Sequence, residues 1–201
     1  MFSDIVGLDQ RLTVAINQCH APWADVFMHT LSKTATWIPL YILLIGLIIY
    51  AYRKPAWIVI LAVVLLVGVA DWTSVHFFKE TIMRFRPSHE PALEGLVRLP
   101  YGKGGFYGFI SSHAANCFAI AAYVSFALRR RFKVFNYGIL YLWAALIAYS
   151  RVYLARHYVG DVLCGALWGV FLAWLLWILT RLTLAKAYPS EPRFLYSPPK
   201  K

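Results

Sequence analysis

Five long apolar segments constrain the fold of this chain more than any other feature. They cover approximately residues 35–52, 56–78, 112–128, 134–151 and 157–182. Each approaches the roughly 20 residues that a helix needs to cross about 30 Å of hydrocarbon. None alternates polar and apolar residues as a half-buried strand does. The sequence therefore predicts an all-α integral membrane helix bundle with five to six transmembrane helices.

The composition agrees with a membrane protein. Hydrophobic residues make up 60% of the chain and charged residues only 14%, which is not the balance of a soluble domain. The formal net charge of +11 would suit nucleic acid, but the basic residues cluster at the ends of apolar segments, where membrane proteins keep them. We therefore expect membrane lipids as partners and no nucleic acid. Nothing in the sequence bears on oligomeric state.

The three cysteines do not indicate a disulfide framework or a metal site. They are odd in number and have no paired spacing, and two of them, Cys117 and Cys164, lie inside apolar segments. Cysteines in such positions behave as small buried hydrophobic residues. The sequence predicts neither a metal nor another cofactor.

Residues 1–34 are predicted to form an amphipathic segment ahead of the membrane bundle. Ile5 and Leu8 fall at helical spacing, with Asp9, Thr13 and Asn17 mostly on the other side. This helix is too polar to span a membrane, and we expect it to lie on the membrane surface. The alternative is a helix that packs against the bundle.

The positions of the basic residues predict how the bundle is oriented. They occur in the first and third loops between spans and at or beyond the end of the fifth span, at Arg53, Lys54, Arg129, Arg130, Arg131, Lys133, Arg181 and Lys186. Alternate crossings put these regions on one side, and the positive-inside rule makes that side cytoplasmic. Residues 35–182 are then the transmembrane domain and 183–201 a polar cytoplasmic tail. Loops 79–111 and 152–157 face outward, toward the periplasm of a bacterial cytoplasmic (inner) membrane.

The stretch SRVYLARHYVGD, residues 150–161, places polar residues of catalytic type against the membrane. If a helix begins at about His157, the side chains of His157 and Asp161 lie on one face, one turn apart. The carboxylate can then accept the proton of one imidazole nitrogen, which leaves the other nitrogen free to attack. Arg151 can offer a planar fork of donors to a phosphate.

Two further stretches carry polar residues to the same predicted face. Lys79, Arg84 and Arg86 gather cationic donors at the end of the second span, which suits a phosphoryl group. Their alternative role is to reach for lipid headgroups.

In GFYGFISSHAAN, residues 105–116, Ser111, Ser112 and His113 fall where a loop turns into the third span. Unpaired backbone N–H groups at a helix start favour an anion. Ser111 can equally act as a helix cap. A histidine in that position can donate a proton to a departing oxygen.

The three motifs together resemble those of the type 2 phosphatidic acid phosphatase superfamily, which includes the vanadium haloperoxidases. They read Lys79-x6-Arg86-Pro87, Ser111-x-His113 and Ser150-Arg151-x5-His157-x3-Asp161. The resemblance covers residues 71–168 by motif and, through the layout of the spans, most of the chain. The second motif reads Pro-Ser-Gly-His in relatives but Ile110-Ser111-Ser112-His113 here. Ser112 must therefore supply its backbone N–H without the conformational freedom of glycine.

The resemblance implies an integral membrane lipid phosphatase that needs no metal. In this reading His157 attacks phosphorus and forms a phosphohistidine, and Asp161 orients it. His113 protonates the leaving lipid oxygen and later helps to activate water. The phosphoryl oxygens would be held by Lys79, Arg86, Arg151, Ser111 and Ser112. Arg84 would bind a second phosphate or a headgroup, or would support the motif's geometry.

The sequence leaves the substrate and three rival functions open. Undecaprenyl pyrophosphate, phosphatidylglycerol phosphate and phosphatidate are the leading candidate substrates, with a lipid A phosphate as an alternative of the same mechanism. The rivals are a catalytically silent lipid-binding or transport protein, a vanadate-dependent peroxidase and a zinc hydrolase. Asp71 either supports Lys79 or bonds a neighbouring helix, and Arg156 either strengthens anion binding or reaches for headgroups.

Overall fold

The computed structural model describes residues 2–189, and this part of the chain is almost wholly helical. The helices are α1 (Phe2–Gln18), α2 (Pro22–Ser32), α3 (Ile38–Tyr52), α4 (Ala56–Trp72), α5 (Glu80–Ile82), α6 (Ser112–Leu128), α7 (Ile139–Tyr153) and α8 (Val159–Ala187). Short 3-10 turns occur at Thr34–Trp37, Pro91–Leu93 and Lys133–Tyr137, and a π turn at Thr73–Lys79. The predicted all-α membrane bundle is confirmed.

Three continuous helical stretches are long and apolar enough to cross a membrane. They are Thr34–Tyr52, Ala56–Ile82 and Val159–Ala187. The two remaining apolar helices, α6 and α7, have 17 and 15 residues. At about 1.5 Å per residue they are shorter than the usual hydrocarbon thickness. The number of five to six spans therefore stays a prediction.

Both ends of the last helix differ from those that the sequence predicts. Helix α8 begins at Val159, with Tyr158 as its N-cap in extended backbone, so His157 lies just before the helix. The helix continues to Ala187, five residues beyond the predicted end, because Leu184 to Ala187 are good helix formers. Residues 190–201 of the predicted tail lie outside the described residues.

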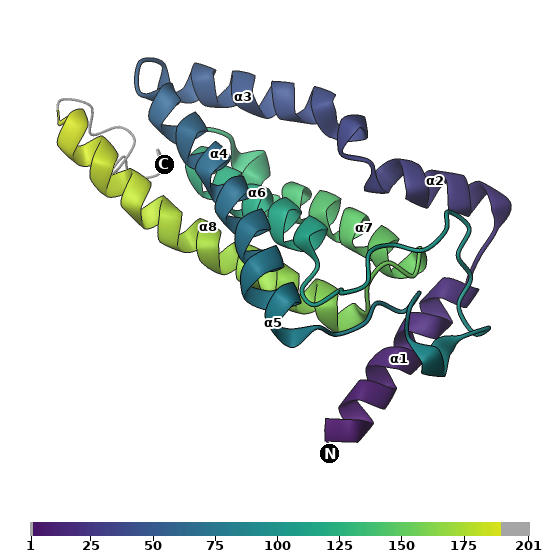
Figure 1. Cartoon of the computed structure of the whole chain (residues 1–201). Helices are drawn as coiled ribbons and strands as arrows, with labels where there is room; N and C mark the ends of the chain where they lie inside the picture. Colours follow the sequence, from purple (N-terminus) through teal and green to yellow (C-terminus); the bar gives the residue numbers. More distant parts are fainter. Residues whose placement is uncertain (1, 190–201) are drawn as a thin grey trace.

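Helix α6 is the centre of the bundle and packs against α4, α7 and α8 (Figure 1). Its approach to α8 depends on two glycines of α8, Gly165 and Gly169. A Cβ atom on Gly165 would lie 2.6 Å from the carbonyl oxygen of Ser111, and one on Gly169 would lie 2.1 Å from that of Ala115. Small residues four apart let two backbones come this close. This close packing holds the start of α6 against the start of α8.

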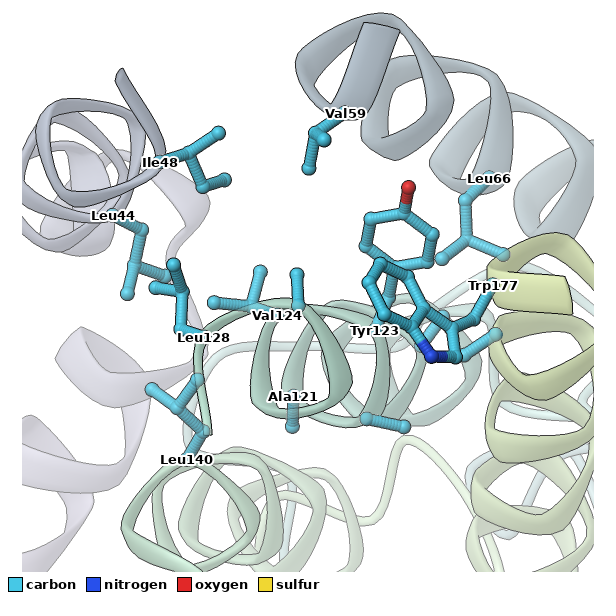
Figure 2. Packing of buried hydrophobic residues seen from close by; sticks show 14 of the residues in the cluster. Leu44, Ile48, Val59, Leu66, Ala121, Tyr123, Val124, Leu128, Leu140 and Trp177 are labelled. Atoms are coloured by element: carbon cyan, nitrogen blue, oxygen red, sulfur yellow. The ribbon is translucent and has the colours of Figure 1, made fainter. Parts of the chain in front are cut away.

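The interior between α4, α6 and α8 is apolar, and the Tyr123 hydroxyl within it is paired. Figure 2 shows Tyr123 of α6 among Val59, Leu66 and Trp177. The Tyr123 ring meets Trp177 edge-on at 5.7 Å. Its hydroxyl lies 2.9 Å from the hydroxyl of Thr180, which satisfies a polar group that would be costly to bury alone.

Helix α1 packs on α7 and α8 through its polar side. Asn17 Nδ2 donates to the Tyr153 carbonyl at 2.7 Å, and the Thr13 hydroxyl accepts from the Val159 N–H at 3.3 Å. The apolar side points away from the bundle, with Ile5 59% and Leu8 50% exposed. The polar face is thus used for packing on protein, and the membrane-surface position of the apolar face stays a prediction.

The α6–α8 contact can be tested with a pair of glycine substitutions. Gly169→Ala should lower the free energy of unfolding by about 1–3 kcal/mol, because the new methyl group overpacks the helix contact. Gly68→Ala in α4 is the matched control, since a Cβ there meets nothing within 4 Å. Thermal unfolding in detergent measures both. A Gly169→Ala protein as stable as the Gly68→Ala control would contradict the contact.

Candidate active site

Three separate stretches of chain meet at one end of the bundle, at the starts of α6 and α8 (Figure 1). The segments around Arg84–Arg86 and 106–108 run antiparallel, with the Gly108 N–H donating to the Arg84 carbonyl at 2.9 Å. The Ser111 N–H donates to the main-chain carbonyl of Asp161 at 3.0 Å. These main-chain bonds tie the three predicted motifs to one another.

His157 is buried at this junction, with 2% of its surface exposed. Its Nδ1 lies 3.0 Å from the carbonyl oxygen of Gly108 and 3.5 Å from Asp161 Oδ2. A carbonyl oxygen only accepts, so Nδ1 carries the proton and Nε2 keeps its lone pair. The nearer partner that fixes this tautomer is therefore Gly108, which the sequence did not single out. A Cβ on Gly108 would lie 2.9 Å from Asp161 Oδ2, so only glycine fits there without displacement.

The surroundings of His157 favour its neutral form. Burial lowers the pKa of His157 to about 4, with Asp161 opposing the shift and Arg86 and Arg151 adding to it. The imidazole is therefore uncharged at neutral pH. A neutral imidazole with a free Nε2 lone pair is the form that can act as a nucleophile.

Asp161 is fully buried, and both of its carboxylate oxygens accept hydrogen bonds. Oδ2 accepts from the Tyr158 N–H at 3.0 Å, which caps the start of α8, and Oδ1 accepts from Arg84 at 2.8 Å. A carboxylate at a helix N-terminus is stabilised by the unpaired N–H groups there. The side chain thus anchors the helix beside His157.

Arg84 lies between two carboxylates. Its guanidinium donates to Asp161 at 2.8 Å and to Asp9 of α1 at 2.8 Å, and it lies over the Tyr158 ring at 3.9 Å. Burial acts to lower the pKa of Arg84, but Asp161 and Asp9 outweigh it and raise that pKa. These contacts favour support of the motif's geometry, the second of the two roles that the sequence allows for Arg84.

Asp9 is a part of this arrangement that sequence reasoning missed. Besides Arg84, it accepts from the Gly160 N–H at 2.9 Å, and a Cβ on Gly160 would lie 2.8 Å from Asp9 Oδ2. The available signal was the spacing of Asp9, Thr13 and Asn17, four residues apart on one helix face. Of the two arrangements that the sequence allows for this helix, the contacts favour packing against the bundle, because the polar stripe faces the loop before α8.

Lys79 and Arg151 are two further cations at the junction. The π turn at the end of α4 places Lys79, whose Nζ donates to the Ser112 hydroxyl at 2.6 Å. Such turns often occur at functional sites. Arg151 Nη1 donates to the Ser32 hydroxyl at 3.1 Å, and its Nε is buried without a hydrogen-bond partner. An unpaired buried donor on a cation suits an anionic ligand.

The loop that precedes α6 holds the Arg86 side chain in place. Its Nε donates to the Tyr107 carbonyl at 3.0 Å, and a Cβ on Gly104 would lie 2.6 Å from its Nη1. Burial and the adjacent Arg156 lower the pKa of Arg86. The cationic cluster of Lys79, Arg86, Arg151 and Arg156 therefore carries mutual repulsion that a bound anion would relieve.

The second motif forms the start of α6. Ser111 is the N-cap, and its hydroxyl accepts from the Ala114 N–H at 3.4 Å. An accepting hydroxyl keeps its own proton for another acceptor, so the capping role and the predicted phosphate contact are compatible. His113 lies in the first turn of α6, within electrostatic range of His157, Arg151 and Lys79.

An apolar groove of about 510 Å³ leads to His113 between α3, α4 and α6. Its walls include Leu44, Ile48, Val63, Val64, Ile120 and Val124. Val64 is 63% exposed, so the groove opens on the apolar flank of the bundle. Among the described residues, 2–189, no group of three His, Cys, Asp or Glu side chains could hold a metal ion.

Comparison with known proteins identifies the family. The model of the PAP2 superfamily matches residues 55–183, which contain all three motifs. The chain belongs to the PAP2 superfamily. This confirms the resemblance inferred from the motifs. Like its relatives, this PAP2 protein is a membrane lipid phosphatase, a hydrolase of phosphate esters.

Two curated relatives of this PAP2 chain are lipid A 4'-phosphatases. That of Bacteroides thetaiotaomicron is 31% identical over 96% of this chain and 85% of its own. That of Porphyromonas gingivalis is 33% identical over 80% of this chain and 68% of its own. Among solved structures, the PAP2-type phosphatidylglycerolphosphate phosphatase of Bacillus subtilis superposes with a TM-score of 0.69, at 22% identity, over 96% of this chain and 90% of its own.

The contact between α1 and Arg84 can be tested by neutralising Asp9. Asp9→Asn keeps the size of the side chain and removes the charge that holds Arg84, so kcat on a lipid phosphate should fall about 10-fold with little change in KM. Asp9→Glu should restore part of the rate. Thr13→Val is the matched control, because it removes another buried contact from α1 to α8 without touching Arg84. An equal loss in Thr13→Val would show that Asp9 only anchors the helix.

The protonation state of His157 can be followed directly by NMR of isotope-labelled histidines, with the signal identified by its absence in His157→Gln. This imidazole should stay neutral as the pH falls from 7 to 5, because its pKa of about 4 lies below the ordinary 6.5. Since the unfolded chain takes up that proton first, the folded protein should also lose stability between about pH 6.5 and 4. A midpoint near 6.5 would refute the shifted pKa.

Proposed function

We propose that this protein removes a phosphate monoester from a lipid A-type glycolipid through a phosphohistidine at His157. The observation that carries the proposal is a buried, neutral imidazole with a free Nε2, beside Arg86 and Arg151, with Lys79 close to both arginines. The two lipid A 4'-phosphatases among the relatives favour this substrate over the other candidates from the sequence, undecaprenyl pyrophosphate, phosphatidylglycerol phosphate and phosphatidate.

In the first step, His157 Nε2 forms a bond to phosphorus as the bond from phosphorus to the lipid oxygen breaks. His113 gives its proton to that leaving oxygen, which departs as an alcohol. The cationic side chains of Lys79, Arg86 and Arg151 stabilise the phosphoryl oxygens, whose negative charge grows in the transition state. The N–H groups at the start of α6 and the Ser111 hydroxyl donate further hydrogen bonds to the phosphoryl oxygens.

In the second step, a water molecule attacks the phosphohistidine and His113 takes a proton from that water. The bond between Nε2 and phosphorus breaks, and inorganic phosphate leaves with His157 neutral again. The hydrogen bond from Nδ1 to Gly108 keeps the same tautomer throughout. The cationic side chains supply the charge stabilisation that a metal supplies in other phosphatases, so the reaction needs no metal.

The groove beside His113 supports a lipid as the substrate. Its volume of about 510 Å³ is in the range of ligand pockets, and its apolar walls suit hydrocarbon chains entering from the membrane. The basic loops at the opposite end of the bundle support an outward-facing site in a bacterial cytoplasmic membrane.

Phosphate release from purified protein tests the proposal. The panel contains lipid A, phosphatidylglycerol phosphate, phosphatidate and undecaprenyl pyrophosphate, all with chelator present. We expect turnover of lipid A that falls about 10³-fold or more in His157→Ala, whereas His20→Ala, an exposed histidine on the connection after α1, should keep full activity. Release from none of the four lipids, or undiminished release by His157→Ala, would refute the proposal.

A further inference from the structure

The apolar groove has a polar inner end. Asp71 of α4 and Asn116 of α6 line it together with His113, while most of the remaining wall is aliphatic. Asn116 Nδ2 donates to Asp71 Oδ1 at 3.4 Å, so the two side chains face each other across the groove. A carboxylate at membrane depth is costly and is usually functional or partnered. The proposed function leaves both residues without a role.

The unsatisfied buried atom at this end of the groove is a hydrogen-bond acceptor. Asn116 Oδ1 is buried and has no hydrogen-bond partner. Asp71 lies beside it. The ionised carboxylate of Asp71 can accept hydrogen bonds but cannot donate one. Lys79 is close enough to Asp71 to interact with it electrostatically, but its Nζ donates to Ser112. A ligand that completes this site must therefore bring a donor, an O–H or an N–H.

The position of the acceptors decides which part of the substrate they meet. His113 and Asn116 are three residues apart on α6, so they lie on one face of the helix, one turn apart. Under the proposed function, on which this inference rests, His113 contacts the oxygen of the leaving alcohol. The next atoms of that alcohol then pass Asn116 and Asp71 before the hydrocarbon enters the apolar part of the groove.

We propose that Asn116 and Asp71 select lipids whose leaving alcohol carries a hydroxyl or an amide N–H close to the phosphate ester. Acylated sugars and a glycerol with a free hydroxyl meet this requirement. A polyprenol and a diacylglycerol do not, because they leave the buried Asn116 Oδ1 unpaired. Sites with buried polar groups reject analogues that lack the matching group far more strongly than apolar pockets reject one methylene.

The test compares kcat/KM on four lipid phosphates with that on p-nitrophenyl phosphate, whose leaving alcohol has neither a chain nor a donor. The wild-type protein should prefer lipid A and phosphatidylglycerol phosphate over phosphatidate and undecaprenyl phosphate by about 10-fold or more. Asn116→Leu should lower kcat/KM on lipid A and on phosphatidylglycerol phosphate by about 10-fold. It should leave kcat/KM on p-nitrophenyl phosphate unchanged. Asn116→Gln, which keeps an acceptor, should restore part of the loss.

Ile120→Ala is the matched control, because Ile120 lines the apolar part of the same groove. Ile120→Ala should lower kcat/KM on all four lipids by a similar factor. Equal wild-type rates on lipids with and without a donor would overturn the inference, and so would an Asn116→Leu protein that keeps its rate on lipid A or loses p-nitrophenyl phosphate turnover in parallel. Turnover of no lipid by the wild-type protein would instead refute the proposed function, and the inference with it.

Discussion

The buried carboxylate of Asp161 is the interaction on which the site depends. An unpaired charge in this position would be very costly. Here it is compensated by the N–H groups at the start of α8 and by Arg84, which Asp9 of α1 also holds in place. The main-chain carbonyl of the same residue receives the Ser111 N–H. One residue therefore joins all three motifs and α1, which explains why a helix outside the matched family region packs against the catalytic loop with its polar side.

Charge around His157 is distributed unequally. Arg84 is paired with two carboxylates, those of Asp161 and Asp9. The other cations near His157 are Lys79, Arg86 and Arg151, and the Arg151 Nε has no hydrogen-bond partner. A surplus of partly buried cations next to a neutral imidazole makes the site complementary to an oxyanion with its charge spread over several oxygens. The cationic side chains repel one another, and a bound anion would relieve that repulsion.

The sequence predicts the helical class, the approximate positions of the apolar helices and the residues that meet at the junction, because long apolar runs indicate helices and motif spacing indicates chemistry. It does not predict Gly108 as the partner of His157, since every residue has a main-chain carbonyl and the sequence does not show which one lies near the imidazole. The sequence also predicts the start of α8 too early, because a Tyr158 N-cap does not resemble the usual capping residues. It leaves open whether the polar stripe of α1 meets water or protein, since periodicity shows that a helix has two faces but not which face packs on the bundle.

The central claim is that Nε2 of His157 accepts the phosphoryl group. It is tested most directly by mixing the protein with ³²P-labelled lipid A, quenching in alkali on the millisecond scale and locating the label by mass spectrometry. The account predicts an acid-labile phosphoryl group on residue 157 and none in a parallel sample of His157→Ala. Label on any other residue, or rapid turnover with no phosphorylated protein at any time, would contradict it.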